Sequence, residues 1–182
     1  MIGRLAALLM LAAVACGGGS DPPAEAPASP GGAEAAALTL VSPAFEEGEA
    51  IPDVYSCRGS NVSPPLEWTG VPDGAVELVL TLQDPDAPGR TFTHWTVFGI
   101  EPSVDGSDEG GVPEGGIEGA NDVGGAGYGG PCPPPGPAHR YVFSLMVLDV
   151  PSGLEAGAAP DAVVEATTDA VATATLTGLY PG

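Results

Sequence analysis

RYVFSLMVL, at residues 140–148, is the stretch that decides the fold, because it has the β-branched and aromatic composition of a central β-strand. THWTVFGI, at residues 93–100, has the same character. Apolar residues alternate over residues 76–82, which is the pattern of a half-buried strand. We predict strands at all three places, with 93–100 and 140–148 in the centre of a sheet.

Glycine and proline divide the rest of the chain into short segments. The 182 residues include 28 glycines and 21 prolines, which favours strands joined by turns. We expect further strands at 38–41 and 173–179, and one helix that begins at Pro160 and continues to about Val171. Residues 105–126 are Gly-rich and acidic and predict a long loop. The predicted fold class is all-β with a minor helix in the C-terminal region.

The N-terminal segment predicts export. Residues 1–15 carry one positive charge at Arg4 and then an apolar run that is too short to span a bilayer. Cys16 follows small residues and resembles a bacterial lipobox, in which the signal peptidase cleaves before a cysteine that receives a diacylglyceryl group. We predict a lipoprotein signal peptide at 1–15, a lipidated Cys16 with a disordered Gly/Pro/Ala linker at 16–37, and one folded domain at 38–182.

This pattern predicts an exported protein that is lipid-anchored to the bacterial cell envelope, on its periplasmic or extracellular face. Ordinary secretion is the alternative. The formal net charge is −20, with four arginines and no lysine. Such a surface repels nucleic acid and anionic headgroups, so no nucleic-acid partner is expected. We interpret the acidity as a source of solubility, with a docking surface for a basic partner as the alternative.

Two cysteines remain after Cys16. Export would place Cys57 and Cys132 where disulfides persist, so they form either a bridge or two small buried thiols. They are far apart and lack a CxxC spacing, which gives no support for a zinc site. We expect no metal and no cofactor.

The chain has two histidines, and both lie in dense polar clusters. DPDAP at 84–88 follows the 76–82 strand, and His94 opens the next one. GYGGP at 127–131 leads to HRY at 139–141, where His139 and Tyr141 share one face of a strand. We predict that the clusters form one small anion pocket.

The expected pocket has a defined arrangement. His94 faces the Asp84/Asp86 turn, and His139 stands beside Tyr141 below a nest of backbone N–H groups. The residues expected to donate from this nest are Gly129 and Gly130. Nearby carboxylates are expected to give both imidazoles some positive character.

These four motifs, in this order, resemble the phosphatidylethanolamine-binding protein family, and in particular its bacterial YbhB/YbcL-type branch, also called Raf kinase inhibitor-like. Further matches lie at 51–52, 55–59, 61–68, 119–122 and 176–180, so the resemblance spans about 38–180. It implies a sandwich of two antiparallel sheets with Greek-key connections, a cis peptide at Ala87–Pro88, and a cavity for phosphate or a phosphorylated headgroup. The cavity positions that it implies are Asp84, Asp86, Pro88, His94, Gly129, Pro131, His139 and Tyr141.

The leading functional hypothesis is a binding protein that holds a small anionic or phosphorylated ligand. A hydrolase or lyase using Asp84, His94 and His139 as acid/base groups is the first alternative. A protease-inhibitor-type interaction protein is the second, and its protein partner is unknown. The sequence contains no GxSxG nucleophile elbow, and we assign no catalytic residue.

Overall fold

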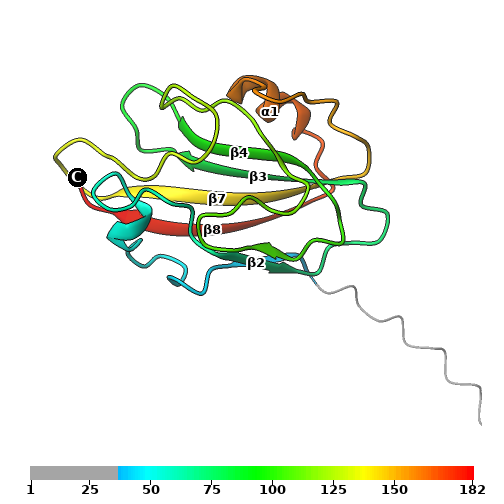
Figure 1. Ribbon diagram of the computed structural model, residues 1–182, viewed down its shortest axis with the longest axis horizontal. Coiled ribbons are helices and arrows are strands. Elements are labelled where there is room, and N and C mark those ends of the chain that lie inside the picture. The colour runs from blue at the N-terminus through cyan, green and yellow to red at the C-terminus, as the bar shows by residue number, and fades with distance from the viewer. Residues whose placement is uncertain (1–36) are drawn as a thin grey trace, which may run out of the picture. The chain divides into compact units, whose positions relative to one another are not determined.

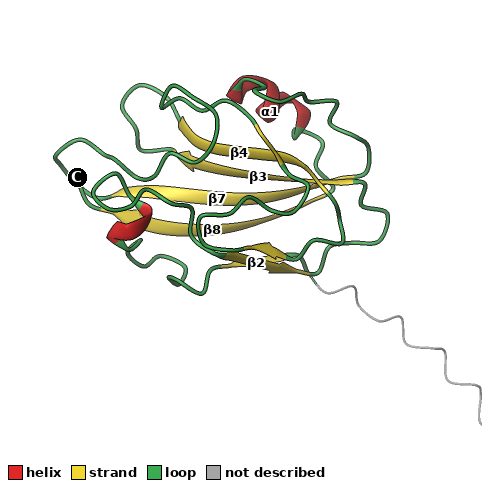
Figure 2. Ribbon diagram, viewed as in Figure 1, coloured by secondary structure: helices red, strands yellow, loops and turns green. Residues whose placement is uncertain are grey.

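The computed structural model describes residues 37–182, which form two antiparallel β-sheets and one short α-helix (Figures 1 and 2). The larger sheet has the spatial order β6, β4, β3, β7, β8, and the smaller sheet has the order β1, β2, β5. The predicted all-β fold with two antiparallel sheets is confirmed. In chain order the elements are β1 (Thr39–Val41), the 3-10 helix η1 (Asp53–Tyr55), β2 (Leu66–Thr69), β3 (Glu77–Asp84), β4 (Phe92–Ile100), β5 (Gly106–Ser107), β6 (Ile117–Glu118), β7 (His139–Leu148), α1 (Pro160–Ala166) and β8 (Ala172–Tyr180).

The larger sheet contains a Greek-key connection. Strands β3 and β4 are adjacent, β6 pairs with the outer edge of β4, and β7 returns to pair with β3 on its other side. On the way, the chain contributes β5 to the smaller sheet. The segment 105–126, predicted as a loop, therefore supplies an edge strand to each sheet.

Strand β3 is buried on both faces, so the prediction of a half-buried strand is wrong. Leu78, Leu80 and Leu82 belong to the core between the larger sheet and the smaller sheet with its loops. Val79, on the opposite face, packs with Val163 of α1 in a second core. The helix covers a face of the larger sheet that a half-buried strand would leave open to solvent.

The helix is shorter than predicted and ends at Ala166. The hydroxyl of Thr167 donates to the Val163 carbonyl at 2.9 Å, and Val171 N–H donates to the carbonyl of Val147 in β7 at 2.8 Å. The chain has therefore joined the larger sheet before the predicted helical pattern ends.

One end of the larger sheet gathers the polar clusters. β3 ends at Asp84, which is paired with Phe92 at the start of β4. β7 runs antiparallel to β3 and begins at His139, so its first residues lie at the same end. In residues 37–182 no helix is long and apolar enough to cross a membrane. The predicted signal peptide and Cys16 lie outside the described residues.

Candidate functional site

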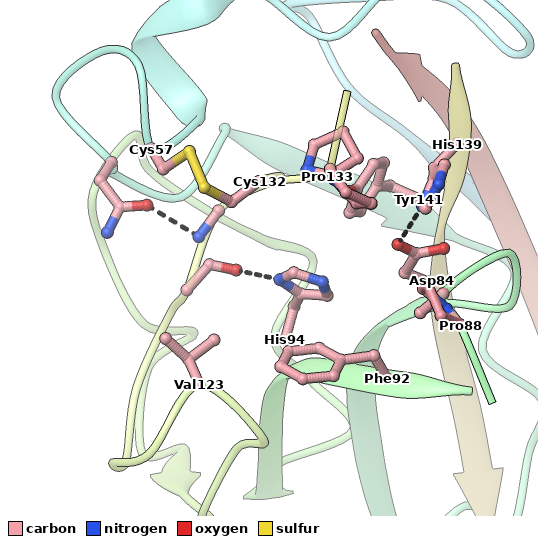
Figure 3. A pocket seen from close by; sticks show the side chains of 15 residues that line it. Cys57, Asp84, Pro88, Phe92, His94, Val123, Cys132, Pro133, His139 and Tyr141 are labelled. Atoms are coloured by element: carbon pink, nitrogen blue, oxygen red, sulfur yellow. Dashed lines mark hydrogen bonds and ion pairs between the residues drawn. A yellow bond between two sulfur atoms is a disulfide. The ribbon is translucent and has the colours of Figure 1, made fainter. Parts of the chain in front are cut away.

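A cavity of about 310 Å³ lies at this end of the larger sheet (Figure 3). Strand ends supply its polar groups, and the loops around them supply mainly apolar side chains. The residues that line it are Cys57, Asn61, Asp84, Ala87, Pro88, Phe92, His94, Val123, Gly129, Gly130, Cys132, Pro133, Pro134, His139 and Tyr141.

The structure brings together all but two of the predicted site residues. Asp86 does not line the cavity, because its carboxylate accepts hydrogen bonds from the Arg140 side chain at 2.7 and 2.9 Å and from the Arg140 backbone N–H at 2.9 Å. These bonds hold the pKa of Asp86 well below its usual range. Pro131 is buried outside the lining and accepts the Cys57 N–H at 3.1 Å through its carbonyl. Asp86 thus joins the turn after β3 to the start of β7, and Pro131 joins the segment after the glycines to the segment of Cys57.

Asp84 orients His139. Its Oδ2 lies 2.7 Å from His139 Nδ1, and its Oδ1 accepts the Asp86 backbone N–H at 2.8 Å. The sequence predicted that His94 would face the Asp84/Asp86 turn, but the direct hydrogen-bond partner of the Asp84 carboxylate is His139. Both β4 and β7 pair with β3 near Asp84, but the Nδ1 of His94 is bonded to the Gly129 carbonyl, whereas His139 at the start of β7 directs its Nδ1 at the carboxylate.

The turn after β3 also differs from expectation. No cis peptide bond occurs in residues 37–182, so Ala87–Pro88 is trans. The bond from the Asp86 N–H to the Asp84 carboxylate closes the turn, as aspartate side chains commonly do.

His94 belongs to the opposite wall. Its Nδ1 lies 2.7 Å from the Gly129 carbonyl oxygen, while the Gly129 N–H donates to the His94 carbonyl at 3.0 Å. A carbonyl only accepts, so Nδ1 carries the proton, and Nε2 of the neutral ring is an acceptor. Figure 3 shows this second ring nitrogen directed into the cavity, toward the side that carries Asp84 and Tyr141.

The charge state of His94 also differs from the prediction. Burial lowers the pKa of His94, and the hydrogen bond to Gly129 and the charge of Asp84 compensate only in part. His94 is 4 % exposed, and its ring packs against Phe92 and Tyr141, with ring centres 4.9 and 5.2 Å away. Desolvation therefore outweighs the attraction of the carboxylate, and the imidazole is neutral near pH 7.

The glycine loop, residues 127–131, does not form the predicted nest of backbone N–H groups for an anion. The Gly129 N–H is bonded to His94, and the Gly130 N–H donates to Asn61 Oδ1 at 2.8 Å. A Cβ atom at Gly130 would lie 2.2 Å from the Tyr55 carbonyl oxygen, so glycine is required there for close packing. These glycines hold the wall together, and their N–H groups are not free for a ligand.

Tyr141 carries the most informative atom of the site. Its side chain is fully buried, and its hydroxyl has no hydrogen-bond partner, although it lies near the Asp84 carboxylate and the Cys132 backbone. Burial raises the pKa of Tyr141, and the Asp84 charge adds to the effect. Leaving a buried hydroxyl without a partner costs about 1–3 kcal/mol. A ligand in the cavity would supply the missing acceptor.

The sequence predicted the polar side chains at the base of the cavity, which we call its floor. It did not predict the apolar side chains around them, which we call its rim. Phe92, Val123 and the two prolines Pro133 and Pro134 come from three loops or strand ends. Their types carry no local signal for binding, since each is also common in ordinary loops. Asn61 could have been predicted as a site residue, because it lies in one of the motifs of the family resemblance.

A disulfide closes the wall next to the glycine loop. Cys57 and Cys132 are bridged, with their Cα atoms 5.5 Å apart, so the alternative of two buried thiols is wrong. Both residues line the cavity. The Tyr128 hydroxyl donates to the Tyr55 carbonyl at 2.8 Å and reinforces the same junction.

Comparisons with known proteins agree with this geometry. The family model described as phosphatidylethanolamine-binding protein matches residues 41–181. The chain belongs to this family. A UPF0098 protein of Methanothermobacter thermautotrophicus is 46 % identical over 149 residues, covering 79 % of this chain and 98 % of that protein. A Mycobacterium tuberculosis protein named "Putative lipoprotein LppC" is 39 % identical over 189 residues, covering 96 % of this chain and 92 % of that protein.

Solved structures of the phosphatidylethanolamine-binding protein family share the fold. The homologue CT736 from Chlamydia trachomatis has a TM-score of 0.74 at 39 % identity and covers 80 % of this chain and 98 % of its own. Escherichia coli YbcL has a TM-score of 0.75 at 32 % identity and covers 81 % of this chain and 99 % of its own. The family resemblance of the sequence motifs is thereby confirmed.

Removing the disulfide should destabilise the domain without changing its fold. The bridge joins residues 75 positions apart, and a crosslink of this span is expected to contribute about 4 kcal/mol by restricting the unfolded chain. We expect the Cys57→Ser/Cys132→Ser variant to unfold at a clearly lower guanidinium concentration than the oxidised protein. Reductant should bring the native protein to the midpoint of the variant and leave the variant unchanged. Equal midpoints for the oxidised protein and the variant would contradict this.

Proposed function

We propose that this domain binds a small anionic or phosphorylated ligand in the cavity between His94 and the Asp84–His139 pair. The unpartnered hydroxyl of the fully buried Tyr141 is the observation that carries the proposal. A phosphate oxygen is a strong acceptor for such a donor, and a hydrogen bond to a charged group contributes more than one to a neutral group.

The charge state of His94 refines the class of ligand. With Nδ1–H donating to Gly129, the neutral ring offers Nε2 as an acceptor. A monoprotonated phosphate group has both an acceptor for the Tyr141 hydroxyl and an O–H for His94. A fully ionised anion has no O–H and would have to bind together with a proton on His94. The site is therefore matched to a phosphate or phosphomonoester in its monoprotonated form.

The size and rim of the cavity suggest a ligand larger than a bare ion. A volume of about 310 Å³ falls at the lower end of the range typical of small-molecule pockets. Phe92, Val123, Pro133 and Pro134 present apolar surface around the polar floor. We infer that the anionic group occupies the floor and that an organic substituent contacts the rim.

A hydrolytic function remains the competing hypothesis. The 2.7 Å contact of Asp84 with His139 would suit a general base and the residue that orients it. No serine, threonine or free cysteine is found among the described residues that line the cavity, since Cys57 and Cys132 are bridged. Binding needs no further group, so it is the function that we favour.

We also propose that the domain is tethered to the cell envelope by lipid on Cys16. The support is the export pattern of residues 1–16 together with the relative named "Putative lipoprotein LppC", whose match covers 96 % of this chain. The lipid would hold the binding domain at the membrane surface.

Replacing Tyr141 with phenylalanine tests the binding site. We expect Tyr141→Phe to weaken the binding of inorganic phosphate and of glycerol 3-phosphate about 10-fold or more, because it removes a hydrogen bond to a charged ligand. The free protein should lose no stability and should gain up to about 1–3 kcal/mol, because the substitution removes a buried hydroxyl that has no partner. Isothermal titration calorimetry and thermal unfolding measure the two quantities.

Tyr128→Phe is the matched control for this change. The Tyr128 hydroxyl donates to the Tyr55 carbonyl and does not line the cavity, so its loss should cost about 1 kcal/mol of stability and leave affinity unchanged. Failure of the unaltered protein to bind either phosphate compound, or unchanged binding by Tyr141→Phe, would refute the proposed function.

Affinity for sulfate should fall as pH rises. Sulfate keeps its charge between about pH 5 and 9, so the protein dominates the pH dependence. Burial lowers the pKa of His94 in the free protein, and a bound dianion raises it, so binding takes up a proton between these two pKa values. Affinity should therefore be constant below the pKa of the free protein and decrease above it, by up to about tenfold per pH unit. Calorimetry in buffers of different ionisation enthalpy measures the proton uptake on binding. Equal sulfate affinity at about pH 5.5 and 8.5 would contradict the prediction.

Substituting Cys16 tests the membrane tether. In the full chain expressed in a bacterial host, we expect the protein to fractionate with membranes and to be released by detergent. Cys16→Ala should prevent lipid attachment and move the protein to the soluble or secreted fraction. Cys57→Ser/Cys132→Ser controls for the general loss of a cysteine and should stay with the membrane. Equal distribution of the Cys16→Ala variant and the unaltered protein would count against the tether.

A further inference from the structure

All three arginines of the described chain lie within two residues, along the sequence, of a residue that lines the cavity. Arg58 follows Cys57 in the disulfide wall, Arg90 lies in the turn between β3 and β4, and Arg140 follows His139. The chain contains no lysine and has 24 acidic residues, so these three arginines are the only permanently positive side chains in residues 37–182.

Two of these arginines are already neutralised. Arg90 donates to both carboxylate oxygens of Asp122 at 2.6 and 3.1 Å, and Arg140 is similarly bound to Asp86. Within residues 37–182, Arg58 forms no ion pair with a carboxylate. Its guanidinium is thus the one arginine charge in this part of the chain that no carboxylate pairs directly, and the Asp53 carboxylate lies at the far end of the Tyr180 ring, where it accepts the hydroxyl hydrogen.

The guanidinium of Arg58 lies close to the floor of the cavity. Its central carbon is 5.4 Å from the ring centre of Tyr180. Tyr180 is paired directly with His139 across β8 and β7, and paired residues place their side chains on the same face of a sheet, with their Cβ atoms about 5 Å apart. The charge of Arg58 is therefore roughly 10 Å from the imidazole of His139.

The cavity itself provides little positive charge for an anion. Burial lowers the pKa of His94, so that ring is neutral near pH 7, and Asp84 is the acidic group of the floor. The formal net charge of −20 adds a general repulsion. Attraction of an anion into this site requires a local positive charge that is not already paired.

We infer that Arg58 is the cation that attracts the anionic group to the binding site through space, in addition to the preference for a protonated ligand that His94 sets. This inference rests on the proposed function. Two unit charges about 10 Å apart, at effective dielectric constants between water and a protein surface, change an affinity by about 2- to 15-fold at low ionic strength. The change in the logarithm of the affinity is twice as large for a dianion. Salt screens this attraction, because the Debye length at about 0.1 M is about 10 Å.

The test compares charge removal at Arg58 with an equal change of charge far away. Arg58→Gln makes the protein one unit more negative beside the cavity. Val150→Glu makes the same change just after β7, at the opposite end of the strand from His139, where the side chain of Val150 is 62 % exposed. Arg58→Lys keeps the charge. Binding of sulfate and of methanesulfonate is measured by calorimetry at about pH 6, at ionic strengths of about 0.02 and 0.5 M.

We expect Arg58→Gln to weaken sulfate binding at least about 3-fold at low ionic strength, to weaken methanesulfonate binding less, and to lose most of its effect at high ionic strength. Arg58→Lys should retain most of the affinity, and Val150→Glu should change it less than 2-fold. Thermal unfolding of each variant reports separately on the contact of Arg58 with Tyr180, whose loss would not depend on the ligand.

The outcomes separate the two proposals. If Arg58→Gln binds sulfate as the unaltered protein does while Tyr141→Phe loses binding, Arg58 has no role and the site stands. Equal weakening by Arg58→Gln and Val150→Glu, or weakening that persists at high ionic strength, also overturns the role of Arg58. If the unaltered protein binds no anion, the proposed function itself fails.

Discussion

The burial of strand β3 on both faces is the constraint on which the rest of the structure depends. Leu78, Leu80 and Leu82 are fully buried on one face, and Val79 is fully buried on the other. Burying each such side chain contributes about 1.5–3 kcal/mol, so a shift of register by one residue would disrupt both cores together. The fixed register carries Asp84 to the end of the sheet, beside the first residues of β4 and β7. The site is therefore positioned by the core and not by its own contacts.

The two histidines show how burial decides chemical character. Both lie within reach of the same turn, but His139 has the Asp84 carboxylate as a direct partner, whereas His94 has a backbone carbonyl and two aromatic neighbours. A carbonyl favours the neutral tautomer that carries its proton on Nδ1. It does not compensate the cost of burying a fully charged imidazolium. This difference makes the cavity asymmetric, with an oriented imidazole–carboxylate pair on one wall and a neutral acceptor on the other.

Local composition was enough to predict much of the fold, because strands 93–100 and 140–148 carry their own signal and form interior strands of the larger sheet. It was not enough to show that both faces of β3 are covered, since α1 comes from a segment more than 70 residues further along the chain. Similarly, the sequence placed His94 nearer than His139 to Asp84, but register between β3 and β7 brings His139 to the carboxylate. The glycine motif correctly indicated that the backbone comes into close contact with another group there. Only the folded chain shows that the glycine N–H groups already donate to Asn61 and His94.

The neutral state of His94 would give the proposed anion site a selectivity that an ordinary anion site lacks. Where lysines or arginines line a pocket, affinity follows the charge of the ligand. Here a fully ionised oxyanion would direct its lone pairs at the lone pair of His94 Nε2, unless the ring first acquired a proton against the cost of burial. A ligand with its own acidic O–H donates to Nε2 and accepts from Tyr141 without that cost. In the proposed site, binding would therefore depend on the protonation state of the ligand, and the charge of Arg58 would add a separate attraction.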